Sequence, residues 1–464
     1  MLGILSLSRA EAQYISEVLE FLPAPGQFTN SVPWGSPYAA STIVGGVHGS
    51  MGLGAFGGYV IFRFKEPVEN HPHNPYGVDF TVFGNPMPDW SEPGVVWVMQ
   101  DENGNNLPDD KWYELAGSDY FFSSTLRKYQ VTYTNPGDTV ARDVPWTDHL
   151  DSGGIIKANS VHTQPYYPLS DSFPQIPEAE YTLGGSRIQG SVDLEHPPVL
   201  KSIRRAFGYA DNQMRGQAPY TLPDNPYTPQ VENSGGDAFD ISWAIDSMGN
   251  YVDLEQIDFV KVQNAMQSDG GYLGELSTEV TGAVDVAADP SVLGASEMVV
   301  IMDLPLEIGT SEYQMEVFVF HQGRLQQGAS VLWSSSDQSA TVDANHLLKV
   351  TQSGPITLTA SLAGKPQISF SVYTTVQLGQ ATFLGGFSEE AAVRIFPNPA
   401  NDFIHITGTD VTGVTLYDAS GRPVMLKENV HEGESVDISM LPSGVYFVTV
   451  NLNHSEHFYK LLKE

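Results

Sequence analysis

Short hydrophobic runs, rich in β-branched and aromatic residues, recur along the first part of the chain. Examples are GGYVIFRF at 57–64, VDFTVFG at 78–84, GVVWVM at 94–99 and IDFVKVQNA at 257–265. Glycine, proline or asparagine bounds each run, which is typical of strands in an all-β sandwich. The pattern therefore predicts a β-sandwich over residues 14–283. Two stretches without such runs, 134–180 and 211–236, are expected to be long loops that serve as binding surfaces.

A second group of short strands is predicted over residues 284–380, around a central Trp333. Regular spacing of the runs predicts a small β-sandwich here. The segment VLWSSSDQSATVDANHLLKVTQSGPITLTASL at 331–362 resembles the bacterial immunoglobulin-like modules of surface proteins. This resemblance implies a spacer or presenting module without chemistry of its own. We expect residues 381–391 to be a linker.

The last region, residues 392–464, has strands whose side chains alternate, as in VYFVTV at 445–450, so that one face can be buried. Its motifs are Pro397-Asn398-Pro399, LYDASGR around Gly421, LPSGVY at 441–446 and a final strand with Lys460 and Lys463. These motifs resemble the C-terminal sorting domain of the type IX secretion system, a small β-sandwich found in Bacteroidota. The resemblance implies recognition by the type IX translocon and sortase through residues 392–464, and display on the outer cell surface.

The N-terminus carries an apolar run, Leu2 to Leu7, followed by Ala10-Glu11-Ala12, which has the A-x-A form of a signal-peptidase site. A basic segment before the run is missing. We interpret residues 1–13 as the remnant of a secretory signal peptide, with a plain helical N-terminus as the alternative. No other stretch approaches the roughly 18 apolar residues of a membrane span.

Composition narrows the function classes. Acidic residues outnumber basic ones 55 to 22, which gives a formal net charge of −33. Such a surface repels nucleic acid and anionic lipid, so binding to either is excluded, whereas cations and neutral ligands are compatible with it. The chain has 0 cysteines, which excludes disulfides, thiolate metal sites and cysteine nucleophiles.

A polar segment, DENGNNLPDDKWYE at 101–114, has the spacing of a calcium loop. Calcium takes six to eight oxygen ligands, often from alternating positions of one loop. The candidate ligands are Asp101, Asn103, Asn105, the carbonyl of Leu107, Asp109 and Asp110. Glycine stands at position 4 of the loop and Trp112 at position 12, so this is not an EF-hand. The alternative is a cluster of Asx-turns without metal.

Two other acidic sets are weaker candidates. Asp237, Asp240 and Asp246 recur around one predicted strand and form a possible second metal site, or else cap strand ends. Asp79, Asn85 and Glu92 surround a loop that contains Trp90. A zinc site at His71 and His73 is conceivable, but a surface turn is favoured because no third ligand is visible.

Aromatic residues crowd the first region, and exposed rings can stack on sugars or other flat ligands. Trp90, Tyr166 and Tyr167 lie in polar, proline-rich surroundings and are the predicted ligand-binding residues. Trp97, in the middle of a hydrophobic run, is predicted to be core. Landmarks such as FGYADN and GGDAFDISWAID make residues 14–283 similar to a group of bacterial surface proteins. This resemblance implies a jelly-roll-like sandwich without an established reaction.

The sequence thus favours a secreted, surface-anchored, non-enzymatic protein that binds a glycan or another nutrient such as a corrinoid, with calcium as a cofactor. Two alternatives stay open. A glycoside-active enzyme needs two carboxylates about 5 to 10 Å apart, and Glu92 or Asp240 are candidates, although none of the acidic residues stands out. A structural or adhesion protein of the cell surface is the other alternative.

Overall fold

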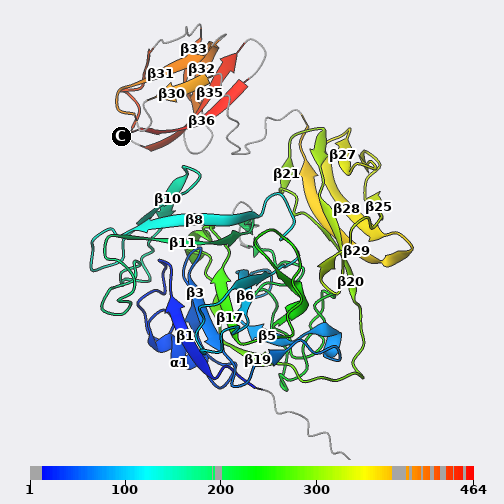
Figure 1. The fold of residues 1–464 in the computed structure, drawn as a ribbon. Coiled ribbons are helices and arrows are strands. Elements are labelled where there is room, and N and C mark those ends of the chain that lie inside the picture. The colour runs from blue at the N-terminus through cyan, green and yellow to red at the C-terminus, as the bar shows by residue number, and fades with distance from the viewer. Residues whose placement is uncertain are drawn as a thin grey trace, which may run out of the picture. The chain divides into compact units, whose positions relative to one another are not determined.

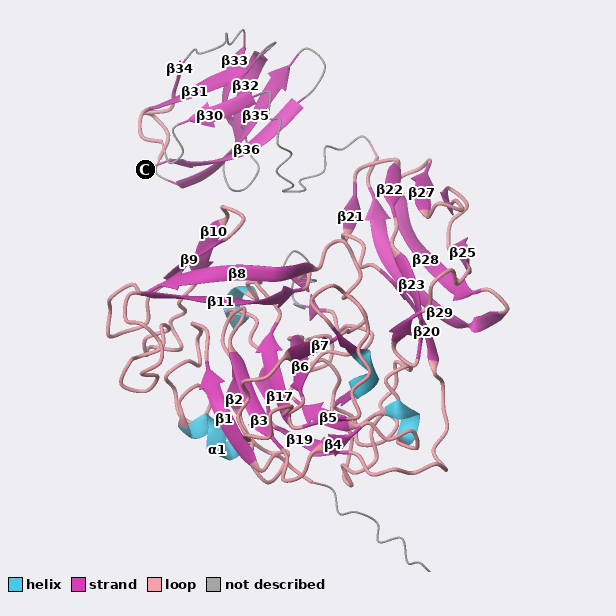
Figure 2. Cartoon of the chain, viewed as in Figure 1, coloured by secondary structure: helices cyan, strands magenta, loops and turns pink. Residues whose placement is uncertain are grey.

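The computed structural model describes residues 13–190, 192–193, 201–378, 393–396, 400–408, 411–417, 423–428, 435–442, 444–452 and 456–463. Strands make up nearly all of the regular structure (Figures 1 and 2), which confirms the predicted all-β class. The predicted signal remnant up to residue 12, the linker 381–391 and the motifs at 397–399 and 418–422 lie outside the described residues.

The centre of the first region is a six-stranded antiparallel sheet with the order β1-β3-β17-β6-β7-β15. Its strands are β1 (Glu17–Leu22), β3 (Tyr59–Arg63), β17 (Phe259–Asn264), β6 (Gly94–Met99), β7 (Trp112–Leu115) and β15 (Ala244–Ile245). The sequence of β6 is hydrophobic almost throughout, because this strand is central and both of its faces are covered.

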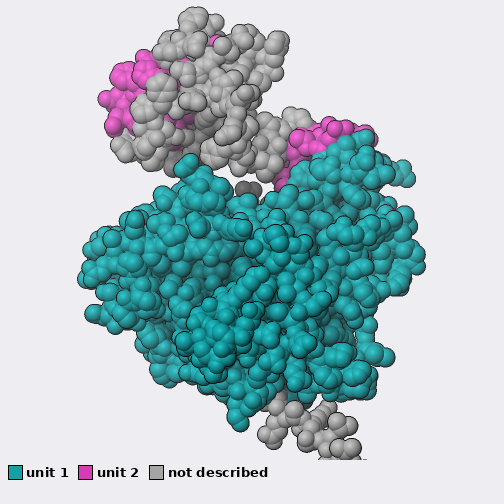
Figure 3. All heavy atoms as spheres, in the orientation of Figure 1, with its two compact units in different colours: residues 1–304, 313–349, 357–373 teal, residues 305–312, 350–356, 374–464 magenta. Residues whose placement is uncertain are grey.

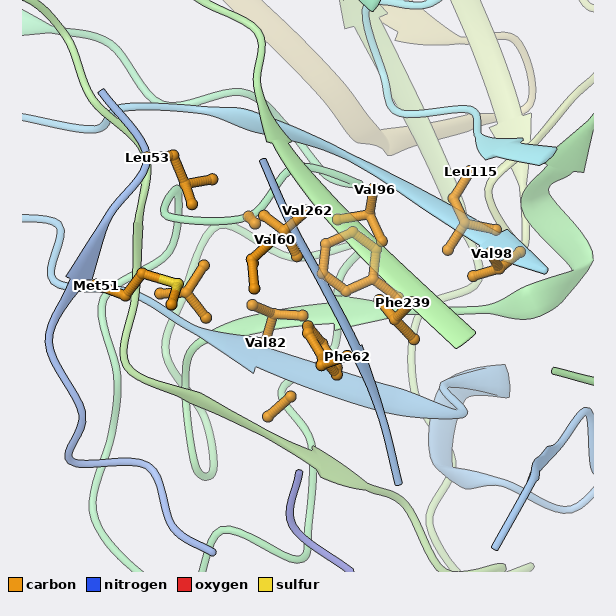
Figure 4. Packing of buried hydrophobic residues seen from close by; sticks show 14 of the residues in the cluster. Met51, Leu53, Val60, Phe62, Val82, Val96, Val98, Leu115, Phe239 and Val262 are labelled. Carbon is orange, nitrogen blue, oxygen red and sulfur yellow. The ribbon is translucent and has the colours of Figure 1, made fainter. Parts of the chain in front are cut away.

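A three-stranded sheet packs against one face of the six-stranded sheet. It consists of β14 (Asp237–Phe239), β5 (Phe80–Phe83) and β19 (Gly282–Asp285), with β5 in the middle. Aliphatic and aromatic side chains from both sheets interdigitate in the core (Figure 4), among them Val60, Phe62, Val82, Val96 and Phe239. Successive side chains of a strand point to opposite faces, so Val60 and Phe62 of β3 lie on the same face, toward the core.

A four-stranded sheet with the order β10-β9-β8-β11 lies across the other face of the six-stranded sheet (Figure 2). Its strands are β8 (Leu126–Thr134), β9 (Val144–Asp148), β10 (Gly153–Ile156) and β11 (Glu180–Arg187). Tyr129, Val131 and Tyr133 of β8 point inward and are fully buried. The stretch 134–180 therefore contains two strands, and our prediction of one long loop was wrong there.

Short elements complete the first region. They are α1 (Tyr38–Thr42), the 3-10 helices η1 (Pro75–Gly77), η2 (Ile241–Trp243) and η3 (Gly271–Leu273), and the paired strands β2 (Met51–Gly52) with β18 (Glu279–Val280), β4 (Val68–Glu69) with β16 (Gln256–Ile257), and β12 (Val192–Asp193) with β13 (Lys201–Ser202). None of the described helices is long and apolar enough to cross a membrane.

The middle region forms three small sheets. They contain β20 (Glu297–Ile301), β23 (Val317–His321) and β24 (Arg324–Leu325); β21 (Glu307–Ile308), β29 (Lys365–Val376), β28 (Gly354–Leu362) and β25 (Val331–Ser335); and β22 (Glu312–Gln314), β27 (Leu347–Val350) and β26 (Ala340–Val342). The strand runs predicted over 284–380 are confirmed as strands.

Strand β23 is packed directly against the first region. Phe320 is fully buried, and its ring centre lies 5.1 Å from that of Phe207. Phe318 lies 5.0 Å from Phe122 by the same measure. The indole N–H of Trp243 donates to the carbonyl oxygen of residue 322 at 3.0 Å. The sheet that contains β23 therefore shares the hydrophobic core of the first region.

The last region has two sheets, with the orders β30-β31-β34 and β33-β32-β35-β36. Their strands are β30 (Val393–Phe396), β31 (Phe403–Gly408), β32 (Val411–Tyr417), β33 (Pro423–Glu428), β34 (Ser435–Asp437), β35 (Gly444–Leu452) and β36 (Glu456–Lys463). Tyr446, Val448 and Val450 of β35 are buried together with Ile404 and Leu416. The buried face predicted from the alternation in this strand is confirmed.

The chain divides into two compact units (Figure 3). One comprises residues 1–304, 313–349 and 357–373, and the other comprises residues 305–312, 350–356 and 374–464.

Candidate functional site

Part of one face of the six-stranded sheet carries polar and aromatic side chains, beside the aliphatic Val95 and Met99. Lys261 of β17 pairs directly with Trp97 of β6, and Trp97 pairs with Glu114 of β7. Directly paired residues point to the same face of a sheet, so these three side chains form one row. Val96 and Val98, on either side of Trp97, point to the opposite face and belong to the core (Figure 4). In β17, Lys261 and Gln263 alternate with Val260 and Val262. This alternation is the sequence signal for the polar side chains on this face.

A pocket of about 270 Å³ opens over the row, between the six-stranded sheet and strands β8 and β11. Aromatic, amide and lysine side chains share its lining with two glycines. The lining residues are Trp97, Trp112, Lys128, Tyr129, Gln130, Gly184, Gly185, Lys261 and Gln263. Concave sites with aromatic walls and a few convergent polar groups are the usual form of small-ligand sites.

Two glycines of β11 make room for this pocket. The side-chain amide of Gln263 donates to the carbonyl oxygens of Gly57 at 2.9 Å and Gly184 at 3.1 Å. These two acceptors fix the orientation of the amide, because only its nitrogen can donate to them. Its Oε1 atom then faces Gly185, where a Cβ would lie only 2.3 Å away. A larger residue at position 185 would therefore collide with the polar wall of the pocket.

Two buried polar atoms of the lining lack hydrogen-bond partners among the described residues. They are the indole Nε1 of Trp97, a donor, and the amide Oε1 of Gln263, an acceptor. An unpartnered buried polar group costs about 1 to 3 kcal/mol. A hydroxyl group both donates and accepts hydrogen bonds. A ligand hydroxyl that reaches these atoms could therefore accept from the indole N–H of Trp97 or donate to the amide oxygen of Gln263.

Lys261 is held among aromatic rings. Its Nζ atom lies 4.3 Å from the ring centre of Tyr59 and 5.9 Å from that of Trp97. Burial lowers the pKa of Lys261 to about 8, although Glu20 and Glu114 act in the opposite direction. The ammonium group is therefore still mostly charged at neutral pH. Burial also raises the pKa of Glu114 to about 7, against a hydrogen bond of 2.6 Å from the Ser186 hydroxyl.

A bulge brings Lys128 to the rim of the pocket. Gly185 pairs with Tyr129 and Arg187 pairs with Leu126, so the pairing of β8 with β11 shifts across Lys128. Lys128 has a φ of 59°, which is uncommon for a residue other than glycine. Bulges often stand next to binding sites, where they redirect a side chain. Strained backbone conformations of this kind cluster at functional sites.

A separate cluster of acidic groups lies outside the pocket. Glu92, Asp211 and Glu279 each bring a carboxylate oxygen within 4.8 Å of the others. Backbone amides of Asn85 and Glu279 donate to Asp211, both at 2.8 Å. Burial raises the pKa of Glu92 to about 8 and that of Asp211 to about 7, and raises the pKa of Glu279 well above its ordinary value. Oxygen donors of this kind can share protons or hold a hard cation.

The sequence indicated only part of this cluster. Glu92 and Asn85 belonged to one predicted set, and both converge on Asp211. Asp79, the third member of that set, lies elsewhere: it accepts from the Asn74 side chain and the Ile241 amide, both at 2.7 Å. Asp211 and Glu279 were missed because each stands in a short polar segment with no ligand-like spacing of its own.

The predicted calcium loop brings its side chains together. Asp101 accepts from the backbone amides of Gly104 and Asn106, both at 2.8 Å. The side-chain amides of Asn103 and Asn105 donate to Asp109, at 3.1 and 3.0 Å. The side-chain oxygens of these two asparagines accept from the backbone amides of Asn105 and Leu107, at 3.0 and 2.7 Å. The donor types, carboxylate and amide oxygen, therefore fit calcium.

Leu107 and Asp110 complete the predicted loop. Asp110 accepts from the Glu102 amide at 3.0 Å, and the amide of Leu107 donates to the side-chain oxygen of Asn105 at 2.7 Å. These contacts are also those of consecutive Asx-turns, and calcium binding here stays a prediction.

The weaker predicted metal set, Asp237, Asp240 and Asp246, is not a cluster. Asp237 accepts from the amides of Asn212 and Gln213, at 3.0 and 2.7 Å. Asp240 caps η2 by accepting from the Ser242 amide, and Asp246 closes its own exposed turn. Each carboxylate thus accepts from backbone amides. The interpretation as a second metal site was wrong, and the alternative, separate capping residues, is the one that these contacts support.

Our prediction that Trp90, Tyr166 and Tyr167 are exposed was also wrong. Their exposed fractions are 6%, 1% and 3%. The polar, proline-rich segments around these residues are loops that fold back over the rings. The Tyr167 hydroxyl, for example, donates to the carbonyl of Pro177 at 2.7 Å. Trp97, which we expected in the core, is only half-buried and lines the pocket.

The two histidines at 71 and 73 lie side by side, with ring centres 5.6 Å apart. Within the described ranges, no third metal-ligating side chain completes a site with them. The favoured interpretation as a surface turn agrees with the exposure of His73.

Residues 394–464 match the family described as the secretion system C-terminal sorting domain. The protein is therefore secreted and targeted to the cell surface, and its last region indicates interaction with the type IX secretion machinery. This confirms the resemblance found in the sequence motifs. No curated protein matches the chain.

Comparison with solved structures gives only weak similarity. Tandem immunoglobulin domains A164-A165 of titin are 13% identical, with a TM-score of 0.14, 37% of this chain and 98% of that chain covered. FdeC, an Escherichia coli adhesin, is 10% identical, with a TM-score of 0.18 and coverage of 45% and 78%. Domains 4–9 of the surface layer protein SbsC are 14% identical, with a TM-score of 0.17 and coverage of 49% and 44%. Scores this low carry no argument about function.

Proposed function

We propose that the protein is a non-enzymatic glycan-binding protein on the outer surface of a Bacteroidota-type bacterium. The sorting domain supports the export route. The pocket between the six-stranded sheet and strands β8 and β11 is the proposed ligand site. The rings of Trp97 and Trp112 stack on the apolar face of a sugar, and the polar lining takes its hydroxyl groups.

One observation carries this proposal: two residues of the lining contribute a buried donor, Trp97 Nε1, and a buried acceptor, Gln263 Oε1, both without partners among the described residues. Buried polar groups in proteins are almost always hydrogen-bonded, so each exception needs an explanation. A sugar hydroxyl that reaches these atoms would supply both kinds of partner.

We propose calcium as a structural cofactor bound by the loop from Asp101 to Asp110. Five oxygen-bearing side chains converge there although all are exposed or half-buried. A cation would balance the three carboxylates among them. Its role would be to fix the connection between β6 and β7, the two strands that carry Trp97 and Trp112.

The test is a glycan array followed by isothermal titration calorimetry with the full-length protein. Trp112→Ala should weaken the binding of any glycan found by about 0.5 to 1.5 kcal/mol beyond the loss of contact area. Trp34→Ala is the matched control, because Trp34 is 42% exposed and does not belong to the pocket lining. Equal affinities of the wild type and Trp112→Ala would contradict the proposed site.

Hydrolysis is the alternative that one observation favours. Glu92 has a raised pKa of about 8, as a general acid requires. Its partners lie within 4.8 Å, however, which is closer than the separations of about 5 to 9.5 Å in retaining and inverting glycosidases. Release of reducing sugar by the wild type, abolished in Glu92→Gln, would establish the enzyme. A structural or adhesion role would show as an absence of glycan binding.

A further inference from the structure

The charged side chains in the lining of the pocket are all of one sign. They are Lys128 and Lys261, and no acidic side chain belongs to the described lining. This is unexpected by composition, because the chain carries 55 acidic and 22 basic residues. A positively charged pocket in a strongly acidic protein repels cations locally and attracts anions, against the field of the surrounding surface.

Each lysine is placed by a specific structural feature. Lys261 stands in the middle of the central strand β17, where Tyr59 and Trp97 hold its ammonium group. Lys128 reaches the rim because the bulge in β8 imposes the left-handed φ of 59°. A third cation, the guanidinium of Arg187, lies 4.9 Å from the ring centre of Tyr129.

Two carboxylates near Lys261, those of Glu20 and Glu114, lie outside the pocket lining. Glu114 shares the row of Lys261 and Trp97, but its Oε2 atom accepts from the Ser186 hydroxyl at 2.6 Å, and only 5% of the residue is exposed. Glu20 accepts from the Tyr59 hydroxyl at 2.8 Å and is not part of the lining. Both acidic groups favour the charged form of Lys261, but neither belongs to the lining, whose two charged residues are lysines.

We infer that the pocket selects a negatively charged sugar residue, whose ring stacks on the tryptophans and whose anionic group pairs with Lys128 and Lys261. This inference rests on the proposed glycan-binding function and specifies its ligand class. The anionic group is a carboxylate, as in a hexuronate, or a sulfate ester. Both supply the oxygen acceptors that ammonium groups bind through charge-assisted hydrogen bonds.

The experiment is calorimetric titration of the full-length protein with matched pairs of oligosaccharides. Acidic fragments of pectin, alginate and glucuronan are compared with their carboxyl-reduced, neutral forms, and sulfated galactans are compared with desulfated ones. We expect at least one acidic form to bind about tenfold or more tightly than its neutral partner, which corresponds to about 1.4 kcal/mol, because charge-assisted hydrogen bonds are stronger than neutral ones.

Substitutions assign the selectivity to the pocket. Lys128→Gln and Lys261→Gln should each reduce the ratio of acidic to neutral affinity, whereas Lys65→Gln, at an exposed lysine outside the lining, should leave the ratio unchanged. Lys128 is exposed, so its variant tests the inference even if Lys261→Gln fails to fold.

The outcomes separate the two levels of the proposal. Binding of neutral glycans that depends on Trp112 but shows no preference for acidic forms would overturn the charged-ligand inference and leave the proposed function standing. A preference that survives both lysine substitutions would also overturn it. Failure to bind any acidic or neutral glycan would refute the proposed function and this inference together.

Discussion

Replacing Glu275 by glutamine should make the protein more stable in alkaline solution and leave its stability in acid almost unchanged. Glu275 is 6% exposed. Its Oε1 atom accepts from the Gln27 amide at 2.8 Å, and its Oε2 atom has no partner among the described residues. Burial raises the pKa of Glu275 to about 8 from an ordinary value of 4.5. The amide of glutamine keeps the acceptor and never ionises.

The sign follows from proton linkage. Below about pH 4.5 both the folded and the unfolded chain are protonated at this residue. As the pH rises from there to about 8, the unfolded chain has lost the proton and the folded chain retains it, so the free energy of unfolding falls. A tenfold change in proton affinity corresponds to about 1.4 kcal/mol, which limits the loss to about 5 kcal/mol at high pH. Relaxation and water around the carboxylate will reduce this figure.

The assay is urea unfolding of the full-length protein at pH 5 and pH 9. The difference in unfolding free energy between Glu275→Gln and the wild type should grow by several kcal/mol between these two pH values. Glu66→Gln, at an exposed position, is the control and should show no such growth. If the Glu275→Gln difference is the same at both pH values, the inferred protonation of the folded state is wrong.

Three further predictions follow from other parts of the chain. Deletion of residues 388–464 should trap the protein in the periplasm, because the translocon loses its recognition domain; surface display of the shortened chain, measured by protease accessibility on whole cells, would contradict this. A calcium chelator should lower the melting temperature of the wild type, by an amount that corresponds to about 2.7 kcal/mol when calcium was a hundredfold above its dissociation constant. Asp101→Ala should abolish that difference, and identical wild-type curves with and without chelator would exclude the site. Phe320→Ala should destabilise the protein by about 3 to 5 kcal/mol in urea unfolding, because Phe320 is fully buried; a loss below 1 kcal/mol would show that the shared core contributes little.

Local patterns predicted the strands well, because a strand needs only a run of suitable residues. GVVWVM and IDFVKVQNA became β6 and β17, the two central strands of the largest sheet. The sorting domain was recognisable because its motifs are contiguous in the chain. These patterns did not predict the four-stranded sheet that forms the third layer, because its strands β9 and β10 lie in a stretch that resembles a loop in composition.

The pocket could be predicted only in part. The valines around Lys261 already indicate a polar face on an otherwise hydrophobic strand. Whether that face is a pocket or a solvated surface depends on Gly184 and Gly185, which are about 75 residues away in sequence and face it only because β11 crosses over β17. The predicted exposure of Trp90 and Tyr166 was wrong for the same reason. Polar neighbours in the sequence do not show which loops cover a ring in the fold.

The packing of Phe320 against Phe207 limits how this protein can be rearranged. A fragment that ended before β20 would expose Phe122, Phe207 and Trp243, which are now covered by β23 or bonded to the turn that follows it. The middle region is thus not an independent module that could be exchanged without affecting the first region. Recombination that replaced it with another β-sandwich module would have to supply matching aromatic side chains, so these two segments of the gene are constrained to change together.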